Sequence, residues 1–152
     1  MTQNRRGLFF EELEPDEIFE SGGRTITDAD IILFAGLSGD QTRIHMDETF
    51  ARTTVFGGRV AHGALGLSVA TGLITQLGTT EDTAMALLDI SASFKAPIRI
   101  GDTLSVRLQV AKKNETSKAD RGVVFFAFNL VNQDDVTVLE GAETVMVRRR
   151  PA

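Results

Sequence analysis

The feature that most constrains the fold is the run ALGLSVATGLITQL at residues 64–77, which is apolar on nearly every face. Its polar residues are Ser68, Thr71, Thr75 and Gln76. A helix of that composition has to be buried. It is shorter than the roughly 20 residues that a helix needs to cross a bilayer. The rest of the chain is therefore expected to wrap around this helix.

The second half of the chain supplies segments that can do so, because its apolar residues change to a period of two. Apolar and polar side chains alternate in 88–98 and 104–110, and 122–132 and 136–147 supply two more strands. Compact polar or glycine-containing turns separate these segments and suit antiparallel neighbours. Pro97 is expected to mark the end or the edge of the first strand.

The first half of the chain is expected to be helical in short pieces. Segment 28–35 follows Thr27, a good N-cap, and precedes Gly36, a predicted stop. Residues 46–54 are expected to form a further helical turn, before the glycine-rich loop 57–63. This order of elements predicts an α+β fold in which an antiparallel sheet curls around the apolar helix. Such a sheet leaves one edge and one face of the helix uncovered, so self-association through an edge strand is expected.

Length and charge narrow the class of protein. The 152 residues fit a single domain, 1–152, and the net charge of −5 argues against nucleic acid as the main partner. No apolar run is long enough for a membrane span, and the first residues turn acidic where a signal peptide would need an apolar core. We therefore expect a cytoplasmic protein without membrane association. The longest run of like charge, Arg148-Arg149-Arg150, is expected to be a solvated end.

The residues that remain for chemistry gather before the apolar helix. Cysteine, tryptophan and tyrosine are absent, which excludes thiol, phenol and thiolate–metal chemistry. The two histidines, His45 and His62, both lie in the glycine-interrupted region, and Asp40 precedes His45 by five residues. A carboxylate and an imidazole at one site can divide proton transfers without a metal. An aspartate in a Ser-Gly-Asp loop is more often a turn or capping residue, and on the residues alone this structural interpretation of Asp40 is preferred.

His62 and Gly63 stand where the chain enters the apolar helix. The first amides of a helix have no intrahelical acceptor and lie at its positive end, so they form a natural oxyanion site. Gly63 can equally serve a close backbone contact, and His62 can be a polar residue at the helix start. On the residues alone, this simpler structural interpretation is preferred for both.

Several segments follow a recognisable order along most of the chain. They are Phe34-x-x-Leu37-Ser38-Gly39-Asp40-x-x-x-Ile44-His45-x5-Ala51, Arg59-Val60-Ala61-His62-Gly63, Ser93-Phe94-Lys95-Ala96-Pro97 and Gly101-Asp102-Thr103-Leu104. In this order they resemble the signature of the MaoC-like dehydratases, a family that includes the (R)-specific enoyl-CoA hydratases. The resemblance implies a hot-dog fold, a long central helix wrapped by a curved antiparallel sheet, in agreement with the fold expected from periodicity.

The resemblance also implies roles for individual residues. Asp40 would help to activate water for attack at C3 of an enoyl thioester, and His45 would manage the proton delivered to C2. The amide of Gly63 would bind the thioester oxygen as it gains enolate character, with His62 in support.

Further polar side chains surround this pair in the family pattern. Thr71 corresponds to a position, often serine, that can hydrogen-bond the catalytic carboxylate. Ser68 is a rival for that role, and both hydroxyls can instead bond carbonyls of their own helix. Thr42-Arg43 stand where the family usually has Asn-Pro, which loosens the loop between Asp40 and the histidine. Arg43 adds a cation that would meet a CoA phosphate or a substrate carboxylate, or else point to solvent.

By the same resemblance, the activity would be that of an (R)-specific enoyl-CoA hydratase or 3-hydroxyacyl-CoA dehydratase, the reversible addition of water to a trans-2-enoyl thioester. The substrate would be carried by CoA or by acyl carrier protein, with no separate cofactor and no metal. A homodimer or higher homo-oligomer would form. The alternatives are an acyl-CoA thioesterase on the same fold, and a hot-dog domain that binds acyl-CoA without turnover.

Two other classes of enzyme fit the residues less well. A non-haem iron centre could use His45-x-Asp47 with His62, but the second histidine follows too soon for the usual β-barrel and the buried helix stays unexplained. A serine hydrolase is weaker still, because Gly36-Leu37-Ser38-Gly39 lacks the G-x-S-x-G spacing of a nucleophile elbow.

Overall fold

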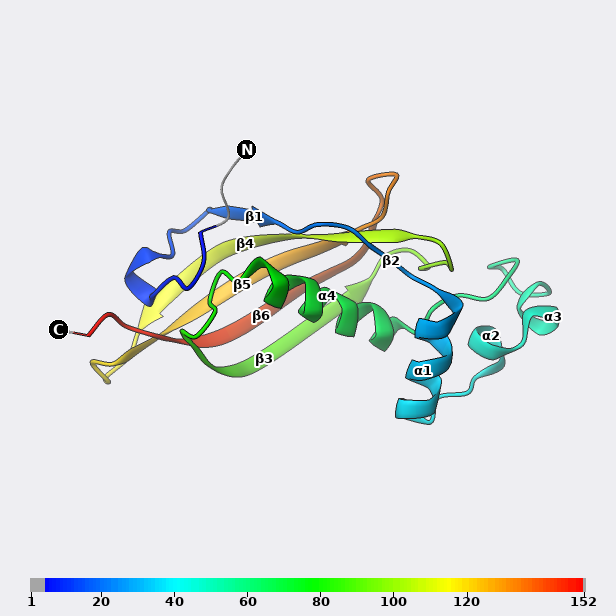
Figure 1. The fold of residues 1–152 in the computed structure, drawn as a ribbon, viewed down its shortest axis with the longest axis horizontal. Coiled ribbons are helices and arrows are strands. Elements are labelled where there is room, and N and C mark those ends of the chain that lie inside the picture. Colours follow the sequence, from blue (N-terminus) through cyan, green and yellow to red (C-terminus); the bar gives the residue numbers. More distant parts are fainter. Residues whose placement is uncertain (1–4, 152) are drawn as a thin grey trace.

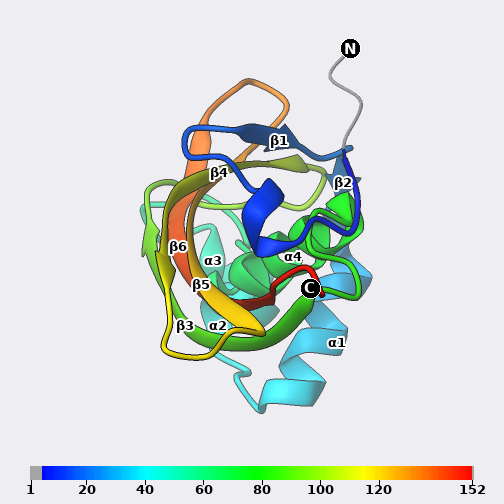
Figure 2. The ribbon, with the colours of Figure 1, turned by 90° about the vertical axis from the view of Figure 1, so that its left-hand side faces the viewer.

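The fold is a curved antiparallel sheet with one long helix along its concave side. The computed structural model describes residues 5–151. The long strands are β3 Ala84–Phe94, β4 Thr103–Glu115, β5 Arg121–Val131 and β6 Thr137–Arg148. The short strands β1 Ile18–Glu20 and β2 Arg24–Thr25 both pair with β4, and the order is β1-β4-β5-β6-β3. The helix is α4, Gly63–Leu77 (Figure 1, Figure 2). The predicted α+β architecture is confirmed.

One face of α4 packs against the sheet. Its buried residues recur at helical spacing and are Leu65, Gly66, Val69, Ala70, Leu73 and Leu77. Full burial of a leucine or valine side chain stabilises the folded state by about 1.5–3 kcal/mol. These buried residues therefore hold α4 against the sheet. Ser68 and Thr75 on the other face are exposed. The chain therefore covers one side of α4 and leaves the other side more open, so the expected uncovered face of the helix is confirmed. Among residues 5–151, no helix is both long and apolar enough to cross a membrane.

The strands follow the predicted alternation most closely in β4. Its core-facing residues, Leu104, Val106, Leu108 and Val110, are all buried. The prediction is less accurate for β3, which starts at Ala84 and ends at Phe94 instead of covering 88–98. The first residues of β3 are uniformly apolar and carry no period of two, so alternation could not reveal them.

The segment before α1 contains elements that periodicity did not predict. A short helix, η1 Phe10–Glu12, precedes β1 and β2. In β1, Phe19 lies opposite Leu108 and is only 3% exposed. Strands of two or three residues have no periodic signal of their own and depend on the neighbour that they pair with.

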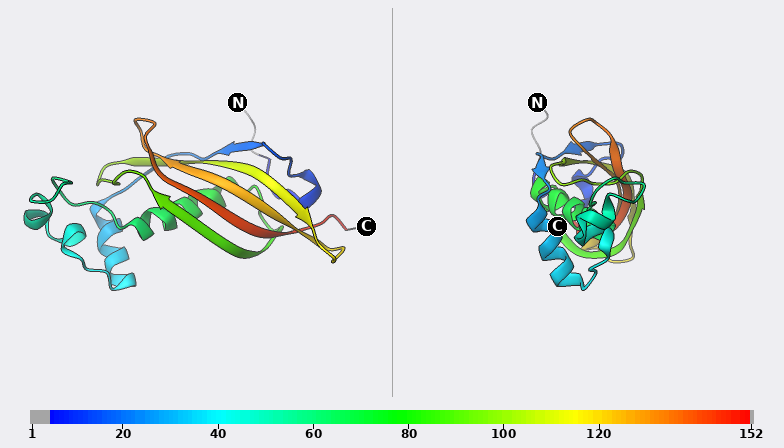
Figure 3. Two further views of the ribbon diagram at one scale, coloured as in Figure 1. Left: turned by 180° about the vertical axis from the view of Figure 1, so that it is seen from behind. Right: turned by 90° about the vertical axis from the view of Figure 1, so that its right-hand side faces the viewer.

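Three short helices gather beyond the N-terminal end of α4: α1 Asp28–Ser38, α2 Arg43–Met46 and α3 Glu48–Ala51. Figure 3 shows the molecule from behind and from the end where these helices lie. The predicted N-cap is confirmed, because the Thr27 side chain accepts from the N–H of Asp30. The predicted stop at Gly36 is wrong. The helix continues to Ser38 and ends at Gly39, whose φ of 77° gives the left-handed cap.

Candidate active site

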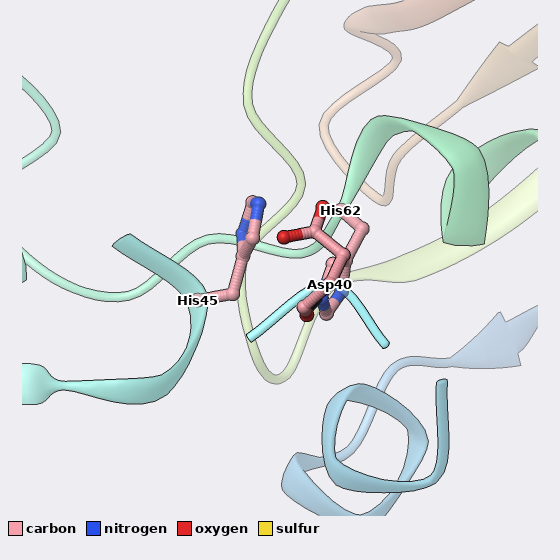
Figure 4. Close-up of side chains that lie close together, drawn as sticks. All are labelled: Asp40, His45 and His62. Atoms are coloured by element: carbon pink, nitrogen blue, oxygen red, sulfur yellow. Dashed lines mark hydrogen bonds between the residues drawn. The ribbon is translucent and has the colours of Figure 1, made fainter. Parts of the chain in front are cut away.

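Three side chains from separate parts of the chain meet at the N-terminal end of α4 (Figure 4). Asp40 lies in the loop after α1, His45 lies in α2, and His62 immediately precedes α4. One nitrogen or oxygen atom from each side chain lies within 4.8 Å of those of the other two. The structure thus brings the predicted acid–imidazole pair together and adds the second histidine to it.

The Asp40 carboxylate is fixed by the loop that follows it. Its Oδ1 accepts hydrogen bonds from the Thr42 hydroxyl at 2.6 Å and from the Thr42 N–H at 3.1 Å. These two bonds lower the pKa of Asp40 below its ordinary value, the hydroxyl being the larger cause. Within residues 5–151, Oδ2 makes no hydrogen bond, so an ionised carboxylate oxygen is available to accept a proton.

His45 is oriented by a backbone carbonyl. Its Nδ1 lies 2.7 Å from the carbonyl oxygen of Val60. A carbonyl can only accept, so we assign a hydrogen to Nδ1. The other nitrogen, Nε2, is then the atom that can give or take a proton at the site.

Gly63 is the first residue of α4 and lines the same cavity as His45. The cavity has a volume of about 520 Å³. Its other lining residues are largely apolar: Ile44, Phe56, Val60, Ala61, Phe94, Lys95, Ala96, Pro97, Ile98 and Val138. A Cβ atom on Gly63 would lie 2.9 Å from Cε1 of Phe94, so this ring approaches the backbone more closely than a side chain would allow. The first residue of α4 therefore lines a largely apolar cavity that the His45 imidazole also lines.

The other predicted residues lie outside this arrangement. The Ser68 hydroxyl donates to the carbonyl of Ala64 at 2.8 Å, and the Thr71 hydroxyl donates to that of Ser68 at 2.8 Å. Both thus bond their own helix, and neither bonds Asp40. The Arg43 guanidinium pairs with Asp47 at 2.9 Å.

The residue pattern did not reveal every contributor. Thr42 entered the sequence analysis only as a departure from the family pattern, yet its hydroxyl and N–H hold the carboxylate. An aspartate side chain often accepts a hydrogen bond from the backbone N–H two residues later, so the expected turn role of Asp40 could have suggested the bond from the Thr42 N–H. Phe94, which packs over Gly63, comes from a distant strand, and no local signal predicts that contact.

The iron centre considered as an alternative is not assembled from the predicted residues. Asp47 accepts from the N–H of Phe50 and from Arg43, so it caps α3 and pairs with a cation. Asp40 stands beside the histidines in its place. The Nε2 of His62 already contacts the Asp40 carbonyl oxygen at 2.9 Å, and its Nδ1 is buried.

Comparison with known proteins agrees with the motifs. Residues 12–124 match the family model described as MaoC like domain. The chain is 37% identical over 143 residues to an (R)-specific enoyl-CoA hydratase of Rhodospirillum rubrum, covering 93% of each protein. It is 37% identical over 114 residues to a 3-hydroxybutyryl-CoA dehydratase of Methylorubrum extorquens, covering 74% of this chain and 69% of that protein. It is 39% identical over 105 residues to protein MaoC of Klebsiella aerogenes, covering 69% of this chain but only 31% of that protein.

Solved structures of similar fold include proteins of the same family. A MaoC-like dehydratase from Rhodospirillum rubrum superposes with a TM-score of 0.87 at 30% identity, covering 96% of this chain and 100% of that one. A conserved hypothetical protein from Mycobacterium tuberculosis with a double hot-dog fold gives a TM-score of 0.84 at 23% identity, over 95% of this chain and 45% of that one. The sheet and α4 therefore form a hot-dog fold. Within that class, the match over 12–124 and the relatives show that the chain belongs to the MaoC-like dehydratase family.

Proposed function

We propose that this chain catalyses the reversible addition of water to the double bond of a trans-2-enoyl thioester, as an (R)-specific enoyl-CoA hydratase or 3-hydroxyacyl-CoA dehydratase. The observation that carries the proposal is the meeting of an ionised Asp40 with His45 beside the Gly63 amide. The names of the hydratase and dehydratase relatives support the same reaction type.

The proposed mechanism divides two proton transfers between the two side chains. In hydration, Asp40 accepts a proton from water as the water oxygen bonds to C3 of the substrate. The proposed step requires His45 to carry a hydrogen on both ring nitrogens. His45 gives the Nε2 proton to C2, while its Nδ1–H remains hydrogen-bonded to the Val60 carbonyl. Water thus contributes hydroxyl to C3, and a proton is added at C2. Return of the Asp40 proton to His45 restores the starting state.

The Gly63 amide would stabilise the charge that develops on the thioester oxygen. Addition at C3 pushes electrons onto that oxygen, and the first amides of α4 lie at the positive end of the helix. Donors fixed before the reaction stabilise such charge without reorganising. No separate cofactor or metal enters the proposed reaction.

The cavity suggests the class of acyl group. Its walls carry aromatic and aliphatic side chains, with Lys95 as the charged exception, and that lysine pairs with Glu140 at 3.0 Å. Such walls suit an aliphatic acyl chain. We propose CoA or acyl carrier protein as its carrier, without choosing between them.

The edge strand β3 supports a proposed homodimer or higher homo-oligomer. It is the last strand in the sheet order, and its exposed residues include Leu87 at 54% and Leu88 at 49%. Uncovered sheet edges with apolar side chains favour pairing with another chain. Light scattering on the purified protein measures the mass, and a monomer at all concentrations would contradict this part of the proposal.

The test of function is product identity. Purified protein is mixed with trans-2-enoyl-CoA substrates of increasing chain length, and loss of the conjugated thioester absorbance is followed with identification of the product. We expect 3-hydroxyacyl-CoA. Release of free CoA from a saturated acyl-CoA, without hydration, would instead favour a thioesterase. Binding without any turnover would favour a non-catalytic domain.

A further inference from the structure

His62 contacts both members of the acid–imidazole pair. It is only 2% exposed. Its ring stacks on the His45 ring, with centroids 4.0 Å apart and planes inclined by 29°. The ring of Phe34 lies at 5.0 Å from His62 in a tilted arrangement. The face of the His45 ring that points to His62 therefore contacts another ring and not solvent.

A hydrogen bond joins the same side chain to the loop of Asp40. The Nε2 of His62 lies 2.9 Å from the backbone carbonyl oxygen of Asp40. Because that oxygen can only accept, Nε2 must carry the hydrogen. Thr42 fixes the carboxylate of Asp40, and His62 fixes its backbone. The two contacts act on different ends of one residue.

Packing alone does not explain a histidine at this position. Its Nδ1 is buried and has no hydrogen-bond partner in the part of the chain that the structure describes. A buried polar atom left without a partner costs about 1–3 kcal/mol. An apolar side chain of similar size would avoid that cost. A histidine at this position therefore carries a stability cost that an apolar residue would avoid, which indicates a role other than packing.

From these contacts we infer that His62 is a positioning residue that sets the Asp40 backbone and the His45 ring relative to each other and to the adjoining Gly63 amide. This inference deepens the proposed hydratase function and rests on it for its kinetic consequence. Displacement of a reacting group by about 1 Å can lower a rate by about 100-fold. Loss of His62 would remove one positioning contact from each of the two proton-transfer residues.

The two contacts can be separated by substitution. His62→Gln keeps an N–H donor of similar reach and removes the ring. His62→Phe keeps a ring that can stack and removes the donor. His62→Leu removes both. We expect kcat to fall most in the leucine variant, by up to about 100-fold, and less in the other two, with KM changing less than kcat.

A stability control separates positioning from general damage. Leu13→Ala truncates a fully buried side chain near η1, at the opposite end of the molecule. It should lower the melting temperature while kcat of the folded protein stays close to wild type. Wild-type kcat in His62→Leu would overturn the inference. So would a loss that follows the unfolded fraction and disappears on cooling.

Nuclear magnetic resonance tests the contact without turnover. The chain has only two histidines, so removal of His62 assigns the imidazole signals of His45. A ring stacked at 4.0 Å shields the His45 ring protons. We expect these signals to move downfield in His62→Gln and to move less in His62→Phe. Unchanged His45 signals in both variants would contradict the inference. An inactive wild type with the expected shifts would instead refute the hydratase proposal and leave the contact in place.

Discussion

The two ends of α4 carry surfaces of opposite character. At its N-terminal end, His45 and Gly63 line a largely apolar cavity of about 520 Å³, and the Asp40 side chain lies beside His45. Near its C-terminal end lies a larger cavity of about 810 Å³, whose lining includes Arg148, Arg149 and Arg150 as well as acidic residues. By size and charge alone, the second cavity would be the better candidate for a functional site.

The far end differs because two of its three arginines are paired with carboxylates of η1. Arg149 pairs with Glu11 at 2.7 Å, and Arg150 pairs with Glu12 at 2.6 Å. The prediction of a solvated end is confirmed for Arg148 and Arg150, which are exposed. It is wrong for Arg149, which is half-buried. The ion pairs of Arg149 and Arg150 connect the C-terminal segment to η1. Arg6 also donates to the carbonyl of Gln76 at 3.3 Å, in the last turn of α4.

The near end has the opposite property. Asp40 Oδ2 and His45 Nε2 make no hydrogen bond within residues 5–151. The amides of the first turn of α4 likewise lack a capping side chain. The comparison teaches that convergent polar groups without partners identify the candidate site better than cavity size does.

The largest expected effect is that of Asp40→Asn. An amide cannot accept the proton from water, so kcat/KM for a trans-2-enoyl-CoA should fall about 10²–10⁴-fold. His45→Ala should cause a loss in the same range. The matched control is Asp47→Asn, which removes another carboxylate from the same segment while keeping a good helix N-cap. Equal losses of kcat/KM in Asp40→Asn and Asp47→Asn would contradict a specific catalytic role for the Asp40 carboxylate.

The next effect concerns the glycine at the helix start. Gly63→Ala places a methyl group 2.9 Å from the Phe94 ring and should shift the amide or the ring, lowering kcat/KM about 10–100-fold. Gly72→Ala is the control in the same helix, because its Cβ would have no neighbour within 4 Å. It should raise stability by about 0.5–1 kcal/mol and leave the rate unchanged. Steady-state kinetics with thermal unfolding measures both, and equal rates in the two variants would argue against a role for the Gly63 amide.

A smaller effect is expected from Thr42→Val, measured as a pH profile. The Thr42 hydroxyl lowers the pKa of Asp40, so its removal should raise that pKa. Activity that needs ionised Asp40 is lost as pH falls through its pKa, so the acid limb of kcat/KM should move to higher pH. Thr42→Ser keeps the hydroxyl and should keep the limb in place. An acid limb that moves to lower pH, or does not move, would show that this bond does not tune the reacting group.

The smallest effect is expected at the far end. Arg149→Gln breaks an ion pair with Glu11 that is partly exposed to solvent, and such pairs contribute little to stability. The melting temperature should fall slightly, and kcat/KM should not change. A large loss of activity in this variant would mean that the C-terminal end takes part in the reaction.

Much of the fold was predictable because its signals are local. The alternation from Leu104 to Val110 predicted β4, and the apolar run predicted α4 to within one residue at its start. The position of β3 was predicted less well because its first residues are uniformly apolar. β1 and β2 were missed because pairing with β4, and not their own sequence, makes them strands.

In the candidate site, too, contacts between residues close in sequence were predictable and contacts between distant segments were not. Asp40 and His45 lie close in sequence, so a motif could join them, and the structure brings them together. The stacking of His62 on His45 and the approach of Phe94 to Gly63 join separate segments. Only the folded chain determines such contacts, so the sequence could name His62 as a supporting residue without showing what it supports.

The measurement that tests the proposed site most directly is a crystal structure with a saturated acyl-CoA, which can bind but cannot be hydrated. The thioester oxygen should lie about 2.7–3.1 Å from the Gly63 nitrogen, with the acyl chain in the apolar cavity and its third carbon beside Asp40 and His45. A thioester bound at the arginine-lined end of α4, or turned away from both side chains, would contradict the proposed active site.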